Sequence, residues 1–564
     1  MAIVAKADYT IQTLVGMVSR GELQLPEMQR EYVWRATRVR DLLDSLYRGY
    51  PSGVILAWES DETIATRDFA VGASTPAIRP LLLLDGQQRL TSLSAVLRGE
   101  PVTVRGRVRP IEILFNLEHP DELTFVTDVN ENSDDDDNSV DADLDIQQRF
   151  RRMTFVVASK ALESLPTWVR VSDVFQNQDS LEILEAKGFD IATLDKQLRQ
   201  KYTKRIQDVK SIQDYQYRMD ILERSKSYEE VTEIFVRVNS LGAKLRSSDL
   251  ALAQITARWR GSLKLFRDYQ DEVEKRGFDL DLGVILRALV AVVTSQSKFL
   301  TVNSIKLTDL QDGWERAKKS LEFALNFVSA NIGIDSQTML SSPMLLITTA
   351  YWADRQDYTI SNDEQRAFCQ WFLLANAKGR YSRGSSETLL DQDLATLRDG
   401  GNASDLTARL RIQVGRLEFT TDELEGRNSR SGAFKTMFLA FRSQDAVDWK
   451  TKLKISAKHH GKSDVIEYHH IFPQAYMKKN SFTDKAKIDD IANLAFIGAE
   501  TNKKISDRAP SNYRGDFDSD DLSAQLIDFD VADEAKDFEK FLEHRRLAIV
   551  NHLNNFLGLK EEPS

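Results

Sequence analysis

Apolar residues recur along this chain with two spacings, one typical of helices and one typical of strands. Near the N-terminus, helical spacing predicts helices over residues 10–20 and 36–49, and short apolar runs predict strands at 54–58 and 80–84. Farther along, helical spacing with charged opposite faces predicts a long helical body, over residues 146–165, 194–225, 227–237, 247–275, 282–297, 307–331, 340–354 and 362–377. The pattern therefore predicts an α+β protein that is mostly helical.

The C-terminal part contains a second, smaller mixture of strands and a helix. Residues 464–471 are rich in β-forming side chains and predict a strand, which ends at Pro473 because proline has no N–H to donate to a neighbouring strand. Residues 492–497 form another apolar run, and 499–507 have the pattern of a short helix. A strand, a loop, a second strand and a helix form a small scaffold that brings distant side chains to one point.

Histidines gather at this scaffold. Four of the seven histidines in the chain lie within twelve residues, namely His459, His460, His469 and His470. A neutral imidazole can take a proton from water near pH 7, so the cluster suits general-base chemistry. A zinc site or a purely structural cluster is the alternative. Closed zinc sites usually recruit cysteine, and the single cysteine, Cys369, is far away in sequence.

The residues around this cluster resemble the HNH, or ββα-metal, nuclease motif. The resemblance implies that His470 is the catalytic base and that His469, directly before it, binds a divalent metal ion. It implies that Asn493 opens the second strand and holds the backbone, and that Asn502 on the helix is a second metal ligand. Lys503 and Lys504, which follow Asn502, are expected to contact phosphates as point charges.

One residue departs from the commonest form of that motif. His469 stands where many members of the family carry a carboxylate. Imidazole is a softer ligand than carboxylate, so Mg²⁺, the ion we expect first, has Mn²⁺, Ni²⁺ and Zn²⁺ as alternatives. His459 and His460 are expected to be solvated loop residues, with further phosphate or metal contacts as the alternative.

Length and composition are those of an ordinary globular protein. The chain has 564 residues, of which 42% are apolar and 29% charged, so two to four domains are expected. One cysteine excludes an internal disulfide and suits a reducing compartment. Residues 1–10 lack the apolar segment of a signal peptide, and the best apolar run, 282–293, is broken by Arg287. We therefore expect a cytoplasmic protein with no membrane partner.

Charge is distributed very unevenly along the chain. The formal net charge is −11, and residues 128–145 contribute nine acids without a lysine or arginine, so the rest of the chain carries only −2. Residues 451–514, around the histidines, carry a net charge of +5 and predict an interaction with nucleic acid. The acidic run itself is expected to be a disordered surface insertion, with a Ca²⁺ loop or a DNA-mimicking lid as alternatives.

A second candidate site follows the strand predicted at 80–84. That strand runs into Asp85, Gly86, Gln87, Gln88 and Arg89 and then into a helix. Backbone N–H groups and a guanidinium at a helix N-terminus can bind an anion. On spacing alone, an ordinary helix cap formed by Asp85, followed by solvated Gln87, Gln88 and Arg89, is the favoured interpretation.

These residues resemble the ParB/sulfiredoxin-like domain that opens GmrSD-type restriction enzymes. Two further segments share the resemblance, one around Gln29 and Arg30 and one around Arg237 and Asn239. The resemblance implies an N-terminal α/β domain that senses modified DNA and hydrolyses GTP or ATP. In its pocket Asp85, Gly86, Gln87, Gln88 and Arg89 would face the triphosphate, beside Gln29, Arg30, Arg237 and Asn239. The chain has no Walker A motif, so such an NTPase would work without a P-loop.

Four regions follow from these assignments. We expect a ParB/sulfiredoxin-like domain at 1–250, a helical body at 251–378, a linker region at 379–430 and a helical domain carrying the HNH motif at 431–564. The basic segments 196–205 and 258–260 suit a phosphate backbone, although solvated helix faces of this composition are more common.

Together, these patterns predict a nucleotide-regulated, metal-dependent DNA endonuclease of antiphage defence. Its partners would be double-stranded DNA, either modified or carrying a host modification such as phosphorothioation, and a nucleoside triphosphate. A homodimer is one assembly that the sequence allows. The alternatives are an NTP-dependent DNA-binding regulator that does not cleave, and an RNA-cleaving toxin.

Overall fold

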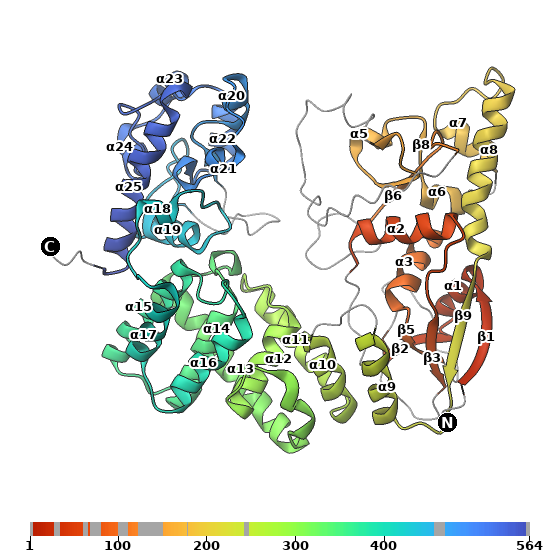
Figure 1. Cartoon of the computed structure of the whole chain (residues 1–564), viewed down its shortest axis with the longest axis horizontal. Coiled ribbons are helices and arrows are strands. Elements are labelled where there is room, and N and C mark those ends of the chain that lie inside the picture. Colours follow the sequence, from red (N-terminus) through yellow and green to blue (C-terminus); the bar gives the residue numbers. More distant parts are fainter. Residues whose placement is uncertain are drawn as a thin grey trace. The chain divides into compact units, whose positions relative to one another are not determined.

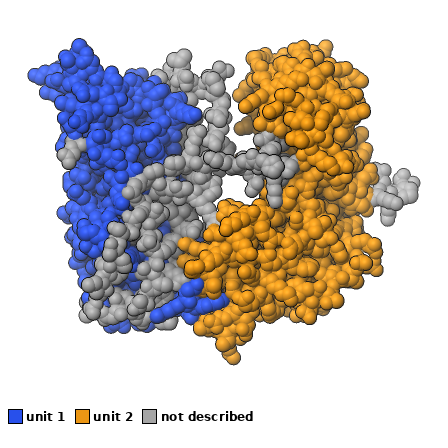
Figure 2. Space-filling model, turned by 180° about the vertical axis from the view of Figure 1, so that it is seen from behind, with its two compact units in different colours: residues 1–261 blue, residues 262–564 orange. Residues whose placement is uncertain are grey.

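In the computed structural model, a six-stranded mixed sheet is the centre of residues 1–261, the first of two compact units (Figures 1 and 2). The structure describes residues 4–26, 34–59, 66–67, 81–99, 111–121, 150–177, 179–241, 247–455 and 468–559. The strands of the sheet are β1 (Val4–Thr10), β2 (Leu23–Pro26), β3 (Ile55–Glu59), β4 (Thr66–Arg67), β5 (Leu81–Asp85) and β9 (Gln216–Leu222). Their spatial order is β1-β9-β3-β5-β2-β4, with β9–β3 and β5–β2 parallel and the other neighbours antiparallel.

Helices cover both faces of this sheet. One face packs on α1 (Ile11–Ser19), α2 (Ala36–Tyr47) and α3 (Gln87–Arg98), and the other on α9 (Tyr228–Leu241) and α10 (Ser247–Arg258). Leu83 belongs to the first core, whereas its neighbours Leu82 and Leu84 belong to the second. A strand buried on both faces reads as a continuous apolar run, which explains the four leucines of β5.

The rest of the first unit is a small antiparallel sheet with its own helices. Strands β7 (Phe155–Val157), β6 (Ile113–Asn116) and β8 (Trp168–Arg170) pair in that order. The helices are α5 (Lys160–Glu163), α6 (Val171–Gln176), α7 (Ser180–Ala186) and α8 (Lys196–Lys210).

Two predicted helices of this unit are partly wrong. Within 146–165, the described residues contain strand β7, which at three residues is too short for its period to be recognised. Within 194–225, the helix ends at Lys210 and strand β9 follows. Tyr217, Met219 and Ile221 alternate into the core, a period of two that helical spacing does not describe.

The second unit, residues 262–564, begins with helices. They are α11 (Ser262–Glu274), α12 (Leu282–Thr294), α13 (Leu307–Phe327), α14 (Met344–Arg355), α15 (Asn362–Lys378), α16 (Ser386–Arg398), α17 (Ala403–Val414), α18 (Thr421–Leu424) and α19 (Gly432–Ser443). Three of these helices, α16 to α18, occupy the region expected to be a linker, and their apolar residues Leu390, Leu394 and Leu406 are buried. The finer division at 250, 378 and 430 stays a prediction.

The C-terminal part of this unit carries the predicted strands and helix. Its elements are β10 (His469–His470), α20 (Gln474–Lys479), α21 (Lys485–Ile488), β11 (Leu494–Ala495), α22 (Ala499–Ile505), α23 (Pro510–Tyr513), α24 (Ser519–Ser523) and α25 (Phe538–Phe556). The fold class, α+β and mostly helical with a small mixed sheet near the N-terminus, is confirmed. Among the described residues, no helix is both long enough and apolar enough to cross a bilayer.

Candidate active site

The site is built on a short antiparallel ribbon. His469 pairs with Ala495 and His470 with Leu494, so β10 and β11 lie side by side. The following helix, α22, buries Thr501 and Ile505 and leaves Asn502 exposed. Two histidines and one helix amide are thereby held on one small scaffold.

Asn493 fixes the backbone where the first strand ends. Its side chain is fully buried, and its Oδ1 accepts a hydrogen bond from the Phe472 N–H at 2.8 Å. Its Nδ2 donates to the carbonyls of Phe472, at 3.2 Å, and Ile488, at 2.9 Å. The Asn493 carbonyl also accepts from the Ile471 N–H at 2.8 Å. One asparagine therefore ties the loop after His470 to the segment before β11.

His470 contacts a carboxylate that arrives from another segment. Its Nε2 lies 3.0 Å from Oδ1 of Asp489, and the Gln474 amide donates to the same oxygen at 3.0 Å. Burial lowers the pKa of His470 and the Asp489 carboxylate opposes that shift, so the ring is neutral at pH 7. An Nε2–H donated to Asp489 leaves Nδ1 as the basic nitrogen. The side chain is 18% exposed, which leaves the ring open to solvent.

His469 is the more deeply buried of the two rings. Burial, together with the neighbouring His470, lowers the pKa of His469 to about 4, and a hydrogen bond with the Asn502 side chain acts in the opposite direction. Its Nε2 is buried and has no hydrogen-bond partner among the described residues. A neutral imidazole with an orphaned nitrogen fits a metal ligand, because a ligating histidine must be unprotonated.

The described residues contribute few other metal donors. In the part of the chain that the structure describes, no group of three or more His, Cys, Asp or Glu side chains is placed to hold a metal ion. A closed structural zinc centre, which needs four protein ligands, is therefore absent there. His469 and Asn502 would suit an open site, where water and a phosphate group could supply the remaining ligands of a divalent ion.

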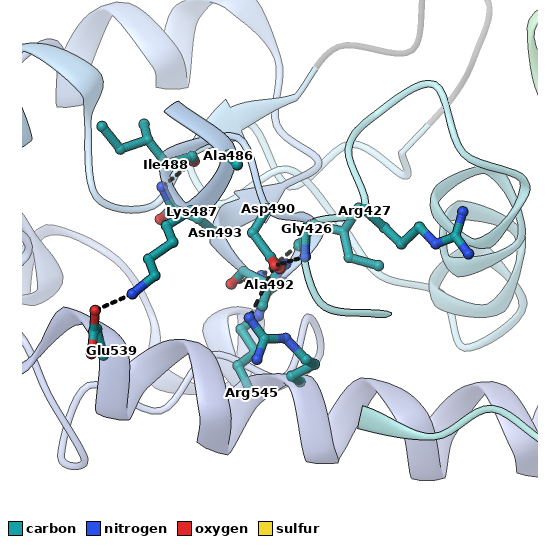
Figure 3. A network of polar contacts seen from close by, with 12 residues as sticks. Gly426, Arg427, Ala486, Lys487, Ile488, Asp490, Ala492, Asn493, Glu539 and Arg545 are labelled. Atoms are coloured by element: carbon teal, nitrogen blue, oxygen red, sulfur yellow. Dashed lines mark hydrogen bonds and ion pairs between the residues drawn. The ribbon is translucent and has the colours of Figure 1, made fainter. Parts of the chain in front are cut away.

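A buried network of charged residues holds the segment that leads into the second strand (Figure 3). Asp490 Oδ2 accepts from the Gly426 N–H at 2.8 Å and from Arg546 at 3.0 Å, and its Oδ1 accepts from the Ala492 N–H at 2.8 Å. Arg545, which comes from α25, donates to the carbonyls of Ala492 at 2.7 Å and Leu494 at 2.9 Å. Burial lowers the pKa of Arg545 to about 9. The guanidinium of Arg545, on the C-terminal helix, thus holds β11 and the residues just before it.

The two lysines expected to bind phosphate differ in their surroundings. Both are exposed residues of α22. Lys504 lies 3.7 Å from a carboxylate oxygen of Asp516 and 4.8 Å from the centre of the Phe517 ring. Lys503 has no carboxylate within 4.0 Å among the described residues.

The second candidate site lies where β5 runs into α3. Gly86 has φ +97°, a left-handed conformation that glycine adopts without strain, and a side chain there would press on Ile55 and Arg89. Arg89 donates to the carbonyls of Ser52 at 2.7 Å and Val54 at 2.8 Å, and lies 3.2 Å from the Asp85 carboxylate. The Arg89 guanidinium therefore holds the segment that leads into β3.

Neighbouring side chains of this motif are buried. Gln87 and Gln88 are 5% and 8% exposed, and Gln88 Oε1 accepts from the Trp34 N–H at 3.2 Å. Trp34 directly follows the segment 27–33, which contains Gln29 and Arg30 and lies outside the described residues. The contact therefore places Gln88 beside Trp34, the first described residue after that segment.

Comparison with known proteins gives this half of the chain its family. Residues 11–256 match the model of the GmrSD restriction endonuclease, N-terminal domain. The first unit is a GmrSD-type domain. An uncharacterized protein of Methanocaldococcus jannaschii, MJ0686, is 22% identical over 587 residues, which cover 97% of this chain and 94% of that protein. The similarity thus extends through both units, and the family supports a restriction endonuclease-type defence protein that acts on DNA.

Two further residues expected in the nucleotide pocket lie on α9 of the GmrSD-type domain. Arg237 is 75% exposed and pairs with Glu233 on the preceding turn. Asn239 lies in the last turn of the same helix, and its side chain is outside the described part. The acidic run 128–145 and the pair His459 and His460 also lie outside the described residues.

Three residues of the C-terminal site were not expected from the sequence. Asp489 lies 3.0 Å from His470, Gln474 contacts both of them, and Arg545 holds the second strand. Asp489 is four residues before Asn493, so a search for carboxylates near the motif residues would have found it among several candidates. No spacing in the sequence points to Arg545.

Proposed function

We propose that this chain is a metal-dependent DNA endonuclease of antiphage defence whose cleavage is controlled by a nucleoside triphosphate. The observation that carries the proposal is the neutral, partly exposed His470 ring beside Asp489 at the end of a strand–strand–helix scaffold. The GmrSD-type N-terminal domain supplies independent support for DNA restriction.

In the C-terminal unit, His470 takes the proton of the attacking water on Nδ1. Asp489 accepts the Nε2–H and stabilises the charge that the ring gains, as a carboxylate does for a catalytic histidine. Asn493 holds the backbone after His470, so that the ring keeps its direction during the reaction. His469 and Asn502 would hold a divalent ion, which supplies positive charge beside the scissile phosphate.

In the N-terminal unit, we propose a pocket for GTP or ATP at the start of α3. The backbone N–H groups after Gly86 and the Asp85, Gln87, Gln88 and Arg89 side chains would face the phosphates, with Gln29, Arg30, Arg237 and Asn239 around them. Because Arg89 already holds the carbonyls of Ser52 and Val54, a bound phosphate would act on the segment leading into β3. That segment is our candidate for the link between nucleotide and sensing of modified DNA.

The test is cleavage of unmodified, glucosylated and phosphorothioated plasmid by the wild-type chain and by His470→Ala, with Mg²⁺, Mn²⁺, Ni²⁺ or Zn²⁺. Each reaction is run without nucleotide and with GTP or ATP. We expect cleavage that requires metal, differs between the DNAs, responds to one nucleotide and is lost in His470→Ala. Full cleavage by His470→Ala would refute the catalytic assignment.

The same assay separates the alternatives. Plasmid that is bound but stays intact with every metal would favour an NTP-dependent DNA-binding regulator. Preferential digestion of total RNA, added in parallel, would favour an RNA-cleaving toxin, because this hydrolysis does not depend on a deoxyribose. Indifference to both GTP and ATP would refute nucleotide control while leaving the nuclease assignment untouched.

A further inference from the structure

Most cations around the candidate active site are neutralised by carboxylates of the same unit. Residues 515–540 contain ten acids and two lysines, a net charge of −8, and they follow directly on the basic stretch 451–514. Arg508 lies 2.9 Å from Asp516, and Arg514 lies 2.9 Å from Asp530. Lys452, Lys454, Lys479, Lys487 and Lys504 are paired with carboxylates as well. The net charge of +5 for 451–514 therefore overstates the positive surface that DNA would meet.

Among the described residues of 451–514, three lysines are exceptions. Lys478, Lys485 and Lys503 are exposed, and none has a carboxylate within 4.0 Å among the described residues. Each stands one or two positions from a lysine that does have such a partner. The pairs are Lys478 and Lys479, Lys485 and Lys487, and Lys503 and Lys504.

Helical spacing places two of these lysines beside the His470 contacts. Lys478 is four residues after Gln474 on α20, and residues four apart share one face of a helix. Lys485 is four residues before Asp489, whose N–H bonds to the Lys485 carbonyl at 2.9 Å, so the same rule applies. Gln474 and Asp489 bond to each other at 3.0 Å beside His470.

Lys503 has a comparable place on α22. It directly follows Asn502, whose side chain raises the pKa of His469 against the effect of burial. Successive residues of an α-helix are about 100° apart, so Lys503 is about 100° from Asn502 and Lys504 about 200°. Lys503 therefore lies closer than Lys504 to the face of α22 that carries Asn502.

The paired lysines are directed elsewhere. Lys479 lies 2.7 Å from Asp507, and Lys504 faces Asp516 and Phe517. Figure 3 shows the Lys487 side chain extending to Glu539 on α25, with which it forms an ion pair. A phosphate that binds any of these lysines must first displace a carboxylate.

We propose that Lys478, Lys485 and Lys503 form a phosphate-binding rim that holds the backbone of duplex DNA over His470, and that their paired neighbours do not take part. The inference rests on the proposed nuclease function and deepens it by naming the DNA contacts. An ammonium group that has no carboxylate within 4.0 Å among the described residues can replace the counterions of a phosphate, and the release of those counterions drives binding. Ammonium groups that are already paired contribute little, because binding exchanges one anion for another.

The experiment compares two triple variants of the full chain that have the same net charge. Lys478→Ala/Lys485→Ala/Lys503→Ala removes the rim, and Lys479→Ala/Lys487→Ala/Lys504→Ala removes the paired neighbours. Both carry His470→Ala so that the DNA stays intact. Binding of a fluorescent duplex is measured by anisotropy over a series of salt concentrations.

Each phosphate contact contributes about 0.9 to the slope of log K against log salt. We therefore expect the rim variant to lose about 2.7 of the slope and the neighbour variant to keep the parent slope. Equal slopes in the two triple variants, or a larger loss in the neighbour variant, would overturn the proposal. If either triple variant fails to fold, single variants are compared instead: Lys478→Ala with Lys479→Ala, Lys485→Ala with Lys487→Ala, and Lys503→Ala with Lys504→Ala. In each comparison we expect the slopes to differ by about 0.9.

The slopes do not depend on cleavage, so the two proposals can fail separately. Cleavage that survives His470→Ala refutes the catalytic assignment of His470, whatever the slopes are. Slopes that do not distinguish the rim from its neighbours refute the rim, even where His470→Ala abolishes cleavage.

Discussion

The imidazole of His470 and the carboxylate of Asp489 lie 3.0 Å apart, although 19 residues separate them in the chain. The carboxylate arrives at the end of α21, and the imidazole at the end of β10. Because a carboxylate can only accept, this contact favours the neutral tautomer with the proton on Nε2. In the proposed reaction, His470 is the base and Asp489 orients it.

Replacing Asp489 tests that relationship. Asp489→Asn keeps the size of the side chain but removes its charge, so the tautomer of His470 is no longer fixed. We expect the turnover rate on saturating plasmid to fall by about ten- to a hundredfold, with little change in the DNA concentration needed for half-saturation. Asp489→Glu should recover part of the rate. Equal loss in both variants, together with a lower melting temperature, would indicate a structural role instead.

Asn493 should be important for stability as well as for activity. Asn493→Ala leaves the Phe472 N–H and the Ile488 carbonyl buried without their partner, which costs about 1–3 kcal/mol. We expect faster hydrogen exchange at the Phe472 amide. Asn512, an exposed asparagine of the same unit, is the matched control, and Asn512→Ala should leave exchange at Phe472 unchanged.

The buried guanidinium of Arg545 is expected to be essential for the ribbon. In Arg545→Lys, a single ammonium group replaces a fork that reaches the carbonyls of Ala492 and Leu494 together. We expect a loss of about 3 kcal/mol in the unfolding free energy of this unit, measured by urea-dependent proteolysis. His544→Ala, an exposed change one residue away, should stay within about 0.5 kcal/mol of the parent.

In the N-terminal unit, Arg89 serves the fold before any ligand binds. Arg89→Lys cannot satisfy the carbonyls of Ser52 and Val54 together, so it should destabilise the nucleotide-free domain by about 1–3 kcal/mol. Arg237→Lys, at an exposed position, should change stability by less than about 0.5 kcal/mol. Melting without nucleotide distinguishes the two. If Arg89→Lys melts like the parent, Arg89 does not stabilise the nucleotide-free fold, and its role would be confined to ligand binding.

Local patterns were enough to predict elements whose apolar spacing is regular. The helix α2, the strand β5 and the strand–strand–helix order around His470 lie where the sequence predicts them. The strand β9 was missed because it follows α8 after a single turn, and helical spacing was extended across it. A change of period from 3.6 to 2 within so short a distance leaves few residues to reveal it.

The contacts of the candidate site were harder to predict, because they join segments that are distant in sequence. Asp489 and Arg545 reach His470 and Leu494 through folding of the whole unit, so no local motif contains them. The surroundings of a charged side chain are equally hidden in the sequence. Lys504 counts as a cation in any sequence window, and only the fold shows that a carboxylate oxygen of Asp516, a dozen residues later, lies 3.7 Å from its ammonium group.

The contact between Arg545 and the second strand also affects when the unit can mature during synthesis. On the ribosome, His469 and His470 emerge well before the residues of α25, and β11 lacks its guanidinium until that helix has been translated. A nascent chain halted between residues 505 and 537 would thus carry both histidines without the donor that steadies their partner strand. Newly made protein should accordingly leave host DNA uncut until translation has passed this helix.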